Sequence, residues 1–96
     1  MAHQVRVHPI FYNRLSFAVE TLEASADAEI EIVGRHLSAI EAEFATRWNE
    51  LPVDERDPDA RFVEGLLDAV PAIFVVRARI QSNDVISIRD IVFIPW

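Results

Sequence analysis

The sequence contains no cysteine and no lysine, and it has only 2 glycines among its 96 residues. The lack of cysteine excludes a disulfide framework and thiol chemistry, and it is typical of cytosolic proteins. No apolar run approaches the roughly 18 residues that span a membrane, and the amino terminus lacks the apolar core of a signal peptide. We therefore expect a cytoplasmic protein with no membrane partner.

The composition predicts one globular domain over residues 1–96, because 51% of the residues are hydrophobic and the chain is long enough for a single core. The net charge of −7 is unevenly distributed. Residues 20–59 carry twelve acidic side chains against three arginines, whereas the rest of the chain carries four against six. Direct binding to nucleic acid is therefore not expected, since such binding depends largely on positive charge near the phosphates.

The first half of the chain has the pattern of one strand followed by two helices. Residues 4–8 alternate as a strand does, and Pro9 suits the first turn of a helix. The apolar stripe of that first helix is Phe11, Leu15, Ala18 and Leu22. The stripe of the second helix is Ile30, Val33, Leu37, Ile40, Phe44, Trp48 and Leu51. Two helices so close in sequence are expected to form an antiparallel hairpin, and a coiled-coil homodimer through the second stripe is an alternative.

Pro52 ends the second helix, and residues 53–60 are expected to form an exposed loop. The loop contains Asp54, Glu55, Asp57 and Asp59 but lacks the glycine and the distal glutamate of a calcium-binding loop. The histidines His3, His8 and His36 have no metal-ligand spacing. Tyr12 and Ser16 lie near no partner motif. We therefore predict no metal site, no cofactor and no catalytic residue.

Residues 61–96 read as three strands. Residues 72–80 alternate so that one face is wholly apolar, while the other begins with Ile73 and Val75 and ends with Arg77 and Arg79. A three-residue loop of Ser82, Asn83 and Asp84 gives the register that best separates apolar from polar side chains on the two faces of the next strand. It adds Ile86, Ile88, Val92 and Ile94 to the apolar face and sets Arg89 opposite Arg77 and Ser87 opposite Arg79. Asp90 is left on the buried side, which indicates a β-bulge or the end of the pairing.

The expected fold is therefore an α+β domain of order β-α-α-β-β-β, with the helical hairpin packed on one face of a small antiparallel sheet. The opposite face would carry the arginines together with Ile73, Val75, Ile91 and Phe93. Two interpretations remain open for it. It is either a solvated face, with arginines paired to Glu64 or Asp68, or a partner surface of mixed apolar and arginine composition. For the second interpretation we predict Arg77, Arg79, Arg89 and Phe93 as the partner-binding residues.

Several segments, in order and spacing, resemble the ParE/RelE superfamily, the toxins of bacterial type II toxin–antitoxin pairs. Residues 5–9 (Val-Arg-Val-His-Pro) leading to Leu15 resemble that family's first strand and helix start. Leu51-Pro52 before Arg56, Gly65-Leu66, and Pro71 followed by Arg77 are similar to later segments of the family. The resemblance covers nearly the whole chain and implies the same order of elements.

The resemblance implies a toxin that is neutralised by a cognate antitoxin protein. ParE-type members act through protein contacts on DNA gyrase, whereas RelE-type members cleave messenger RNA on the ribosome. The basic, tyrosine and histidine side chains used for RNA cleavage are mostly absent here, because Leu67 and Ala72-Ile73 stand at family positions of arginine or tyrosine-arginine. We therefore expect ParE-like action by protein binding. RelE-like cleavage, or a non-toxic family member that only binds protein partners, remains as an alternative.

Overall fold

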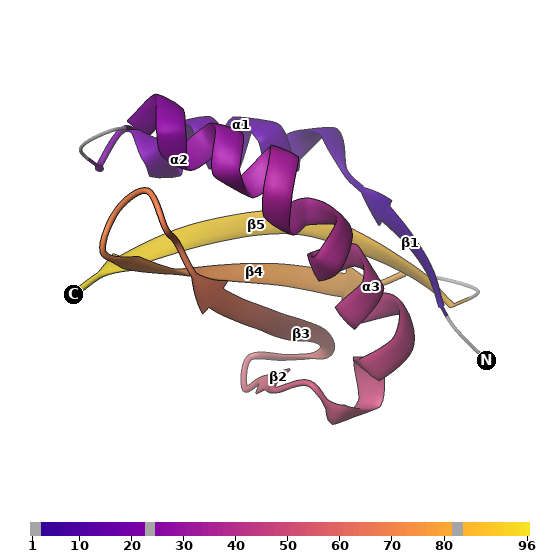
Figure 1. Ribbon diagram of the computed structural model, residues 1–96. Helices are drawn as coiled ribbons and strands as arrows, with labels where there is room; N and C mark the ends of the chain where they lie inside the picture. Colours follow the sequence, from indigo (N-terminus) through magenta and orange to yellow (C-terminus); the bar gives the residue numbers. More distant parts are fainter. Residues whose placement is uncertain (1–2, 23–24, 82–83) are drawn as a thin grey trace.

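The computed structural model describes residues 3–22, 25–81 and 84–96, which form a helical layer on one face of a five-stranded sheet (Figure 1). The sheet has the strand order β1-β5-β4-β3-β2. The elements are β1 (Gln4–Val7), α1 (Pro9–Val19), α2 (Ser25–Glu31), the π-helical turn η1 (Ile32–His36), α3 (Leu37–Arg47), the 3₁₀ turn η2 (Trp48–Glu50), β2 (Val53–Asp54), β3 (Asp57–Leu66), β4 (Ala72–Ile80) and β5 (Val85–Pro95).

The expected α+β class with helices on one face of the sheet is confirmed, but the sheet is mixed and not antiparallel throughout. β1 runs parallel to β5, with Gln4 opposite Val85 and Val7 opposite Ile88, while the other pairs of strands are antiparallel. The chain passes from β1 directly into α1, where the Nδ1 atom of His8 accepts the backbone N–H of Ile10 at 3.0 Å. Pro9 occupies the first helical turn, as its sequence position predicts.

The second helical segment contains a π-turn that changes which of its residues face the core. Leu37, Ile40, Phe44 and Trp48 are buried as expected, but Ile30 is 68% exposed and Val33 45% exposed. Between Ile32 and His36 the helix takes a wider turn, which rotates everything before it relative to α3. Ala28 and Ile32 consequently face the core, and the expected positions of Ile30 and Val33 are wrong.

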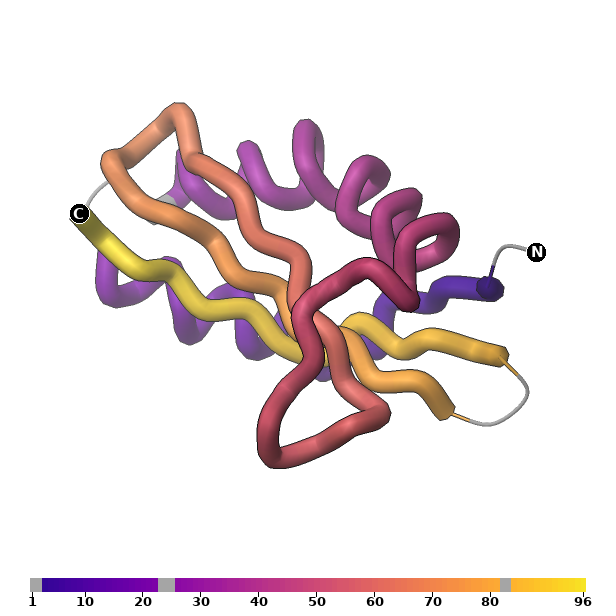
Figure 2. The backbone as a smooth tube through the Cα atoms, turned by 90° about the horizontal axis from the view of Figure 1, so that it is seen from below, coloured from indigo at the N-terminus to yellow at the C-terminus, as the bar shows by residue number. Residues whose placement is uncertain are grey.

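The expected exposed loop over residues 53–60 is also wrong in part. Residues 53–54 form the short strand β2, and β3 begins at Asp57 instead of Arg61. β2 pairs with β3 only at Val53 with Arg61 and Asp54 with Asp57. This short pairing folds an acidic segment against the sheet, and in Figure 2 the segment crosses in front of the strands.

The β4–β5 pairing contains the β-bulge that Asp90 indicates. Near the turn the expected register is confirmed, with Ile80 opposite Ile86, Arg79 opposite Ser87 and Ala78 opposite Ile88. Ser82 and Asn83 of the expected loop lie outside the described residues. Beyond Ile88 the register shifts by one, so Asp90, and not Arg89, lies opposite Arg77. Arg89 is the extra residue of the bulge.

The bulge exchanges the two faces for the rest of β5. Ile91 is buried at 2% exposure and Phe93 packs against the core, whereas Val92 and Ile94 are 49% and 52% exposed. The expected inward positions of Val92 and Ile94 are therefore wrong, as are the expected outward positions of Ile91 and Phe93. The core lies between this sheet face and the helices, and its fully buried large side chains include Phe11, Leu15, Ile32, Phe44 and Ile86.

Candidate functional site

The sheet face turned away from the helices is uncovered except where residues 51–60 cross it, and we call it the open face (Figure 2). Strand alternation and the registers assign its residues. They include Phe62, Glu64 and Leu66 of β3, Ile73, Val75, Arg77 and Arg79 of β4, and Ser87, Arg89, Asp90, Val92 and Ile94 of β5. Arg77, Arg79 and Arg89 thus share one face, as the sequence predicts.

Arg77 and Arg79 are held by the acidic segment that crosses the open face. The Nε atom of Arg77 donates to Asp54 at 3.0 Å, and its Nη2 atom donates to Asp57 at 3.1 Å. Arg79 donates from Nε to the same Asp57 oxygen at 2.8 Å and lies 3.5 Å from Asp59. The expected partners Glu64 and Asp68 are therefore wrong, because the β2–β3 pairing brings other carboxylates closer.

These contacts perturb the titration of two carboxylates. The backbone N–H of Arg56 and the guanidinium of Arg77 hold the pKa of Asp54 below its usual value. The guanidinium of Arg79 does most to lower the pKa of Asp57. Both aspartates therefore stay ionised, and the two arginines are charge-compensated at neutral pH.

Arg89 has a different environment. It lines a small hollow between α1 and the bulge, together with Ile10, Arg14, Arg77 and Asp90. Its Nε atom is buried without a hydrogen-bond partner in the described structure. Arg89 is thus brought to the open face beside Arg77, but it does not join the network of Asp54 and Asp57.

Phe93 does not belong to this surface. It packs against the hydrophobic core and lies beside Phe17 and Ala18 of α1, because the bulge turns it toward the helices. The open face instead presents Val92 and Ile94, together with Leu66 at 56% exposure and the half-buried Ile73 and Val75. No sequence signal other than the misplaced Asp90 could have identified this exchange.

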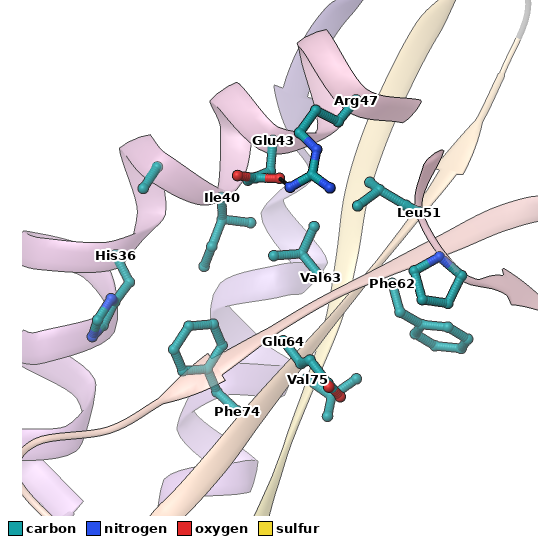
Figure 3. A pocket seen from close by; sticks show the side chains of 12 residues that line it. His36, Ile40, Glu43, Arg47, Leu51, Phe62, Val63, Glu64, Phe74 and Val75 are labelled. Carbon is teal, nitrogen blue, oxygen red and sulfur yellow. Dashed lines mark hydrogen bonds and ion pairs between the residues drawn. The ribbon is translucent and has the colours of Figure 1, made fainter. Parts of the chain in front are cut away.

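A groove lies beside the open face, between α3 and β3 (Figure 3). Its volume is about 540 Å³, within the range of about 300–1,000 Å³ that is common for ligand sites. Ile40, Val63 and Phe74 project into it, and the ion pair of Glu43 with Arg47 at 2.9 Å forms part of its rim. Sequence analysis did not identify this groove, since its lining residues come from η1, α3, the segment 51–52, β3 and β4, which lie far apart in sequence.

The buried carboxylate of Glu31 holds His36, which lines the end of the groove nearest η1. Glu31 is 4% exposed and accepts the backbone N–H of Asp68 at 2.8 Å, that of Ala69 at 2.7 Å, and His36 Nε2 at 2.7 Å. Burial by itself raises the pKa of Glu31, but the two N–H groups and the His36 ring outweigh it, so the pKa lies below its ordinary value. His36 in turn lies against Phe74, with ring centroids 5.0 Å apart.

Within residues 3–22, 25–81 and 84–96, no three histidine, aspartate or glutamate side chains are grouped so that they could hold a metal ion. No helix in the same ranges is long and apolar enough to cross a membrane. Comparisons with protein-family models, with curated proteins and with solved structures found no match. The function must therefore be inferred from the open face and the groove themselves.

Proposed function

We propose that this chain is the ParE-like toxin of a bacterial type II toxin–antitoxin pair, which acts on DNA gyrase through protein contacts and is neutralised by a cognate antitoxin. The observation that carries the proposal is the composition of the open face. Leu66, Val92 and Ile94 are each about half exposed there, on the same face as Arg77 and Arg79 but toward the other end of the strands. Exposed apolar side chains and arginines on one face of a sheet are typical of protein–protein interfaces.

The ion pairs of the open face favour a protein target over RNA. A phosphate that engages Arg77 or Arg79 would have to compete with Asp54 and Asp57, which already occupy donors of these guanidinium groups, and the net charge of −7 would further oppose it. A protein target can pack against the apolar part of the face while these ion pairs stay intact. Contact-based poisoning of an enzyme is therefore more compatible with this surface than messenger-RNA cleavage.

The proposal is tested by inducing the chain in bacterial cells, alone and together with its neighbouring open reading frame. We expect growth arrest that the neighbour relieves, and loss of DNA supercoiling before loss of messenger RNA. Arrest with messenger-RNA cleavage first would instead support the RelE-like alternative. A folded protein that causes no arrest would contradict both kinds of toxin.

A pair of matched variants assigns the effect to the open face. Val92 on the open face is 49% exposed and Val33 on the helical layer is 45% exposed, so glutamate at either position should leave the fold intact. We expect Val92→Glu to abolish the arrest and Val33→Glu to preserve it. Equal loss in both variants would show that the open face is not the contact surface.

A further inference from the structure

In the described structure, the edge of β3 next to the groove has backbone N–H and C=O groups without partners. The backbone N–H of Phe62 donates to the Pro52 carbonyl at 3.2 Å, so the backbone N–H and C=O groups of Phe62 point away from β4. Antiparallel geometry then directs the N–H and C=O groups of Glu64 and Leu66 to the same side, while Val63 and Gly65 bond to β4. β2 ends before it reaches them, and no other described strand pairs with this edge.

Pro52 explains why the pairing stops. Proline has no N–H, so it accepts from Phe62 but cannot return a hydrogen bond to the Phe62 carbonyl. The chain before Pro52 then turns up into η2 and α3, away from the sheet. The free groups run from the Phe62 carbonyl to Leu66, a distance of about 14 Å at about 3.4 Å per residue, which is enough to pair with a short strand. Exposed edges of this kind are templates for strand addition.

The groove lies where the side chains of an added strand would point. On its helix-facing side such a strand would meet Ile40, Val63 and Phe74, all apolar. On the other side it would lie beside Glu64, which is exposed and has no ion pair in the described structure, with Phe62 and Leu66 on either side. Glu43 on the α3 rim is already paired with Arg47. An added strand would therefore be matched by apolar side chains on its helix-facing side and by a basic side chain beside Glu64 on the other.

We propose that the β3 edge and the groove under α3 bind an extended segment of a partner protein, in which apolar and basic residues alternate, by adding it as a strand to the sheet. The inference deepens the proposed function, since it assigns this site to the neutralising antitoxin and leaves the open face to the target. A second copy of this chain suits the edge less well, because two β3 edges would bring their Glu64 carboxylates together in a protein of net charge −7.

The test uses the purified full chain and a synthetic nine-residue peptide of alternating valine and lysine. We expect saturable binding, and at least about tenfold slower hydrogen exchange at the Glu64 and Leu66 amides, which have no partner in the free protein. A peptide of the same pattern with glutamate in place of lysine should bind at least about tenfold more weakly. A valine–lysine peptide with N-methylated backbone should fail in the same way, because it cannot pair with the edge.

Four variants separate hydrogen bonding, charge and groove occupancy. Glu64→Pro removes the edge-facing N–H without disturbing the bonds to β4, and we expect loss of binding of about tenfold or more. Glu64→Gln removes only the charge and should weaken binding less. Ala39→Trp fills the groove from its α3 wall and should abolish binding, while Ser38→Trp, on the same helix but outside the groove, should not.

Three outcomes would overturn the inference. The first is no binding of the valine–lysine peptide up to about 1 mM. The second is exchange protection that falls outside β3. The third is a dimer in sedimentation of the protein alone, with the Glu64 amide already protected, which would identify a second copy as the occupant. None of these measurements uses growth arrest, so the peptide site and the proposed toxin activity succeed or fail separately.

Discussion

The Glu31 carboxylate accepts the backbone N–H of Asp68 at 2.9 and 2.8 Å, although 37 residues separate the two in sequence. The contact joins the end of α2 to the turn between β3 and β4. Residue 31 faces inward because the π-turn that follows it rotates α2 relative to α3. A single buried side chain thus connects the helical layer to the strand turn that borders the groove.

Replacement of Glu31 by glutamine tests this connection. We expect Glu31→Gln to lower the free energy of unfolding by about 2–3 kcal/mol, because a buried carboxylate loses charge-assisted hydrogen bonds. Glu29→Gln, on the same helix but with no hydrogen bond to its side chain in the described structure, should have little effect. Urea unfolding at neutral pH measures both. A similar stability for the two variants would contradict a structural role for Glu31.

The same carboxylate should make the stability depend on pH. The pKa of Glu31 is lower in the folded chain than its ordinary value, so its contribution is fully present above the unfolded pKa. That contribution is lost as the pH falls through the folded pKa. As the pH is lowered from neutral to about 3, the free energy of unfolding should therefore fall less steeply for Glu31→Gln than for the wild type. Parallel curves would show that other carboxylates dominate.

Gly65 leaves room for the Phe74 ring that forms the floor of the groove. A Cβ atom at residue 65 would lie 2.5 Å from the Phe74 Cζ atom, so the ring must move. We expect Gly65→Ala to cost about 1–3 kcal/mol in urea unfolding, as overpacking does. Gly34→Ala is the matched control, because its added Cβ would have no atom within 4 Å other than those of its neighbours and of its own helical backbone. It should stabilise the helix by about 0.5–1 kcal/mol.

The bulge at Arg89 predicts an unusual tolerance to deletion. Removing Arg89 would leave Ile88 facing inward, Asp90 outward and Ile91 inward, which is the alternation of a regular strand. We therefore expect the deletion of Arg89 to give a folded protein with a native circular dichroism spectrum. Deletion of Val92 should unfold the chain, because it would turn Phe93 outward. Unfolding by both deletions would show that the bulge itself is required.

Neutralising a carboxylate of the acidic segment should make the open face around Arg77 and Arg79 more positive. Asp57→Asn should remove one carboxylate partner from both Arg77 and Arg79, which keep Asp54 and Asp59, whereas Glu55→Gln removes one charge from the same loop without changing an arginine contact. We expect Asp57→Asn to elute from a phosphate-bearing column at higher salt than Glu55→Gln. Equal elution would show that net charge alone governs the interaction.

The class of fold could be predicted because each apolar pattern is defined by residues only a few positions apart in sequence. The stripe Phe11–Leu15 and the alternation of β4 each follow from neighbours a few residues apart. The errors arose where an extra residue in a helix or strand shifts the alternation between core-facing and outward side chains. The π-turn before Leu37 rotated Ile30 and Val33 outward, and the bulge at Arg89 exchanged Phe93 with its neighbours.

The candidate site was less predictable because its contacts are not local. Arg77 and Arg79 were correctly assigned to one face, but their partners Asp54 and Asp57 depend on a two-residue strand that carries almost no signal in sequence. The groove depends on the distance between α3 and β3, which no periodicity reports. The parallel pairing of β1 with β5 likewise joins segments from opposite ends of the described chain.

That pairing has a consequence for synthesis of the protein. Gln4 and Val85 are neighbours in the sheet, so β1 has no partner until β5, which follows all the other described elements, has been translated. Helices can form earlier from local contacts, but pairing of distant segments is intrinsically slow. During translation Val5 and Val7 remain without their sheet neighbours, and a nascent chain in that state is the form most prone to aggregate or to need a chaperone.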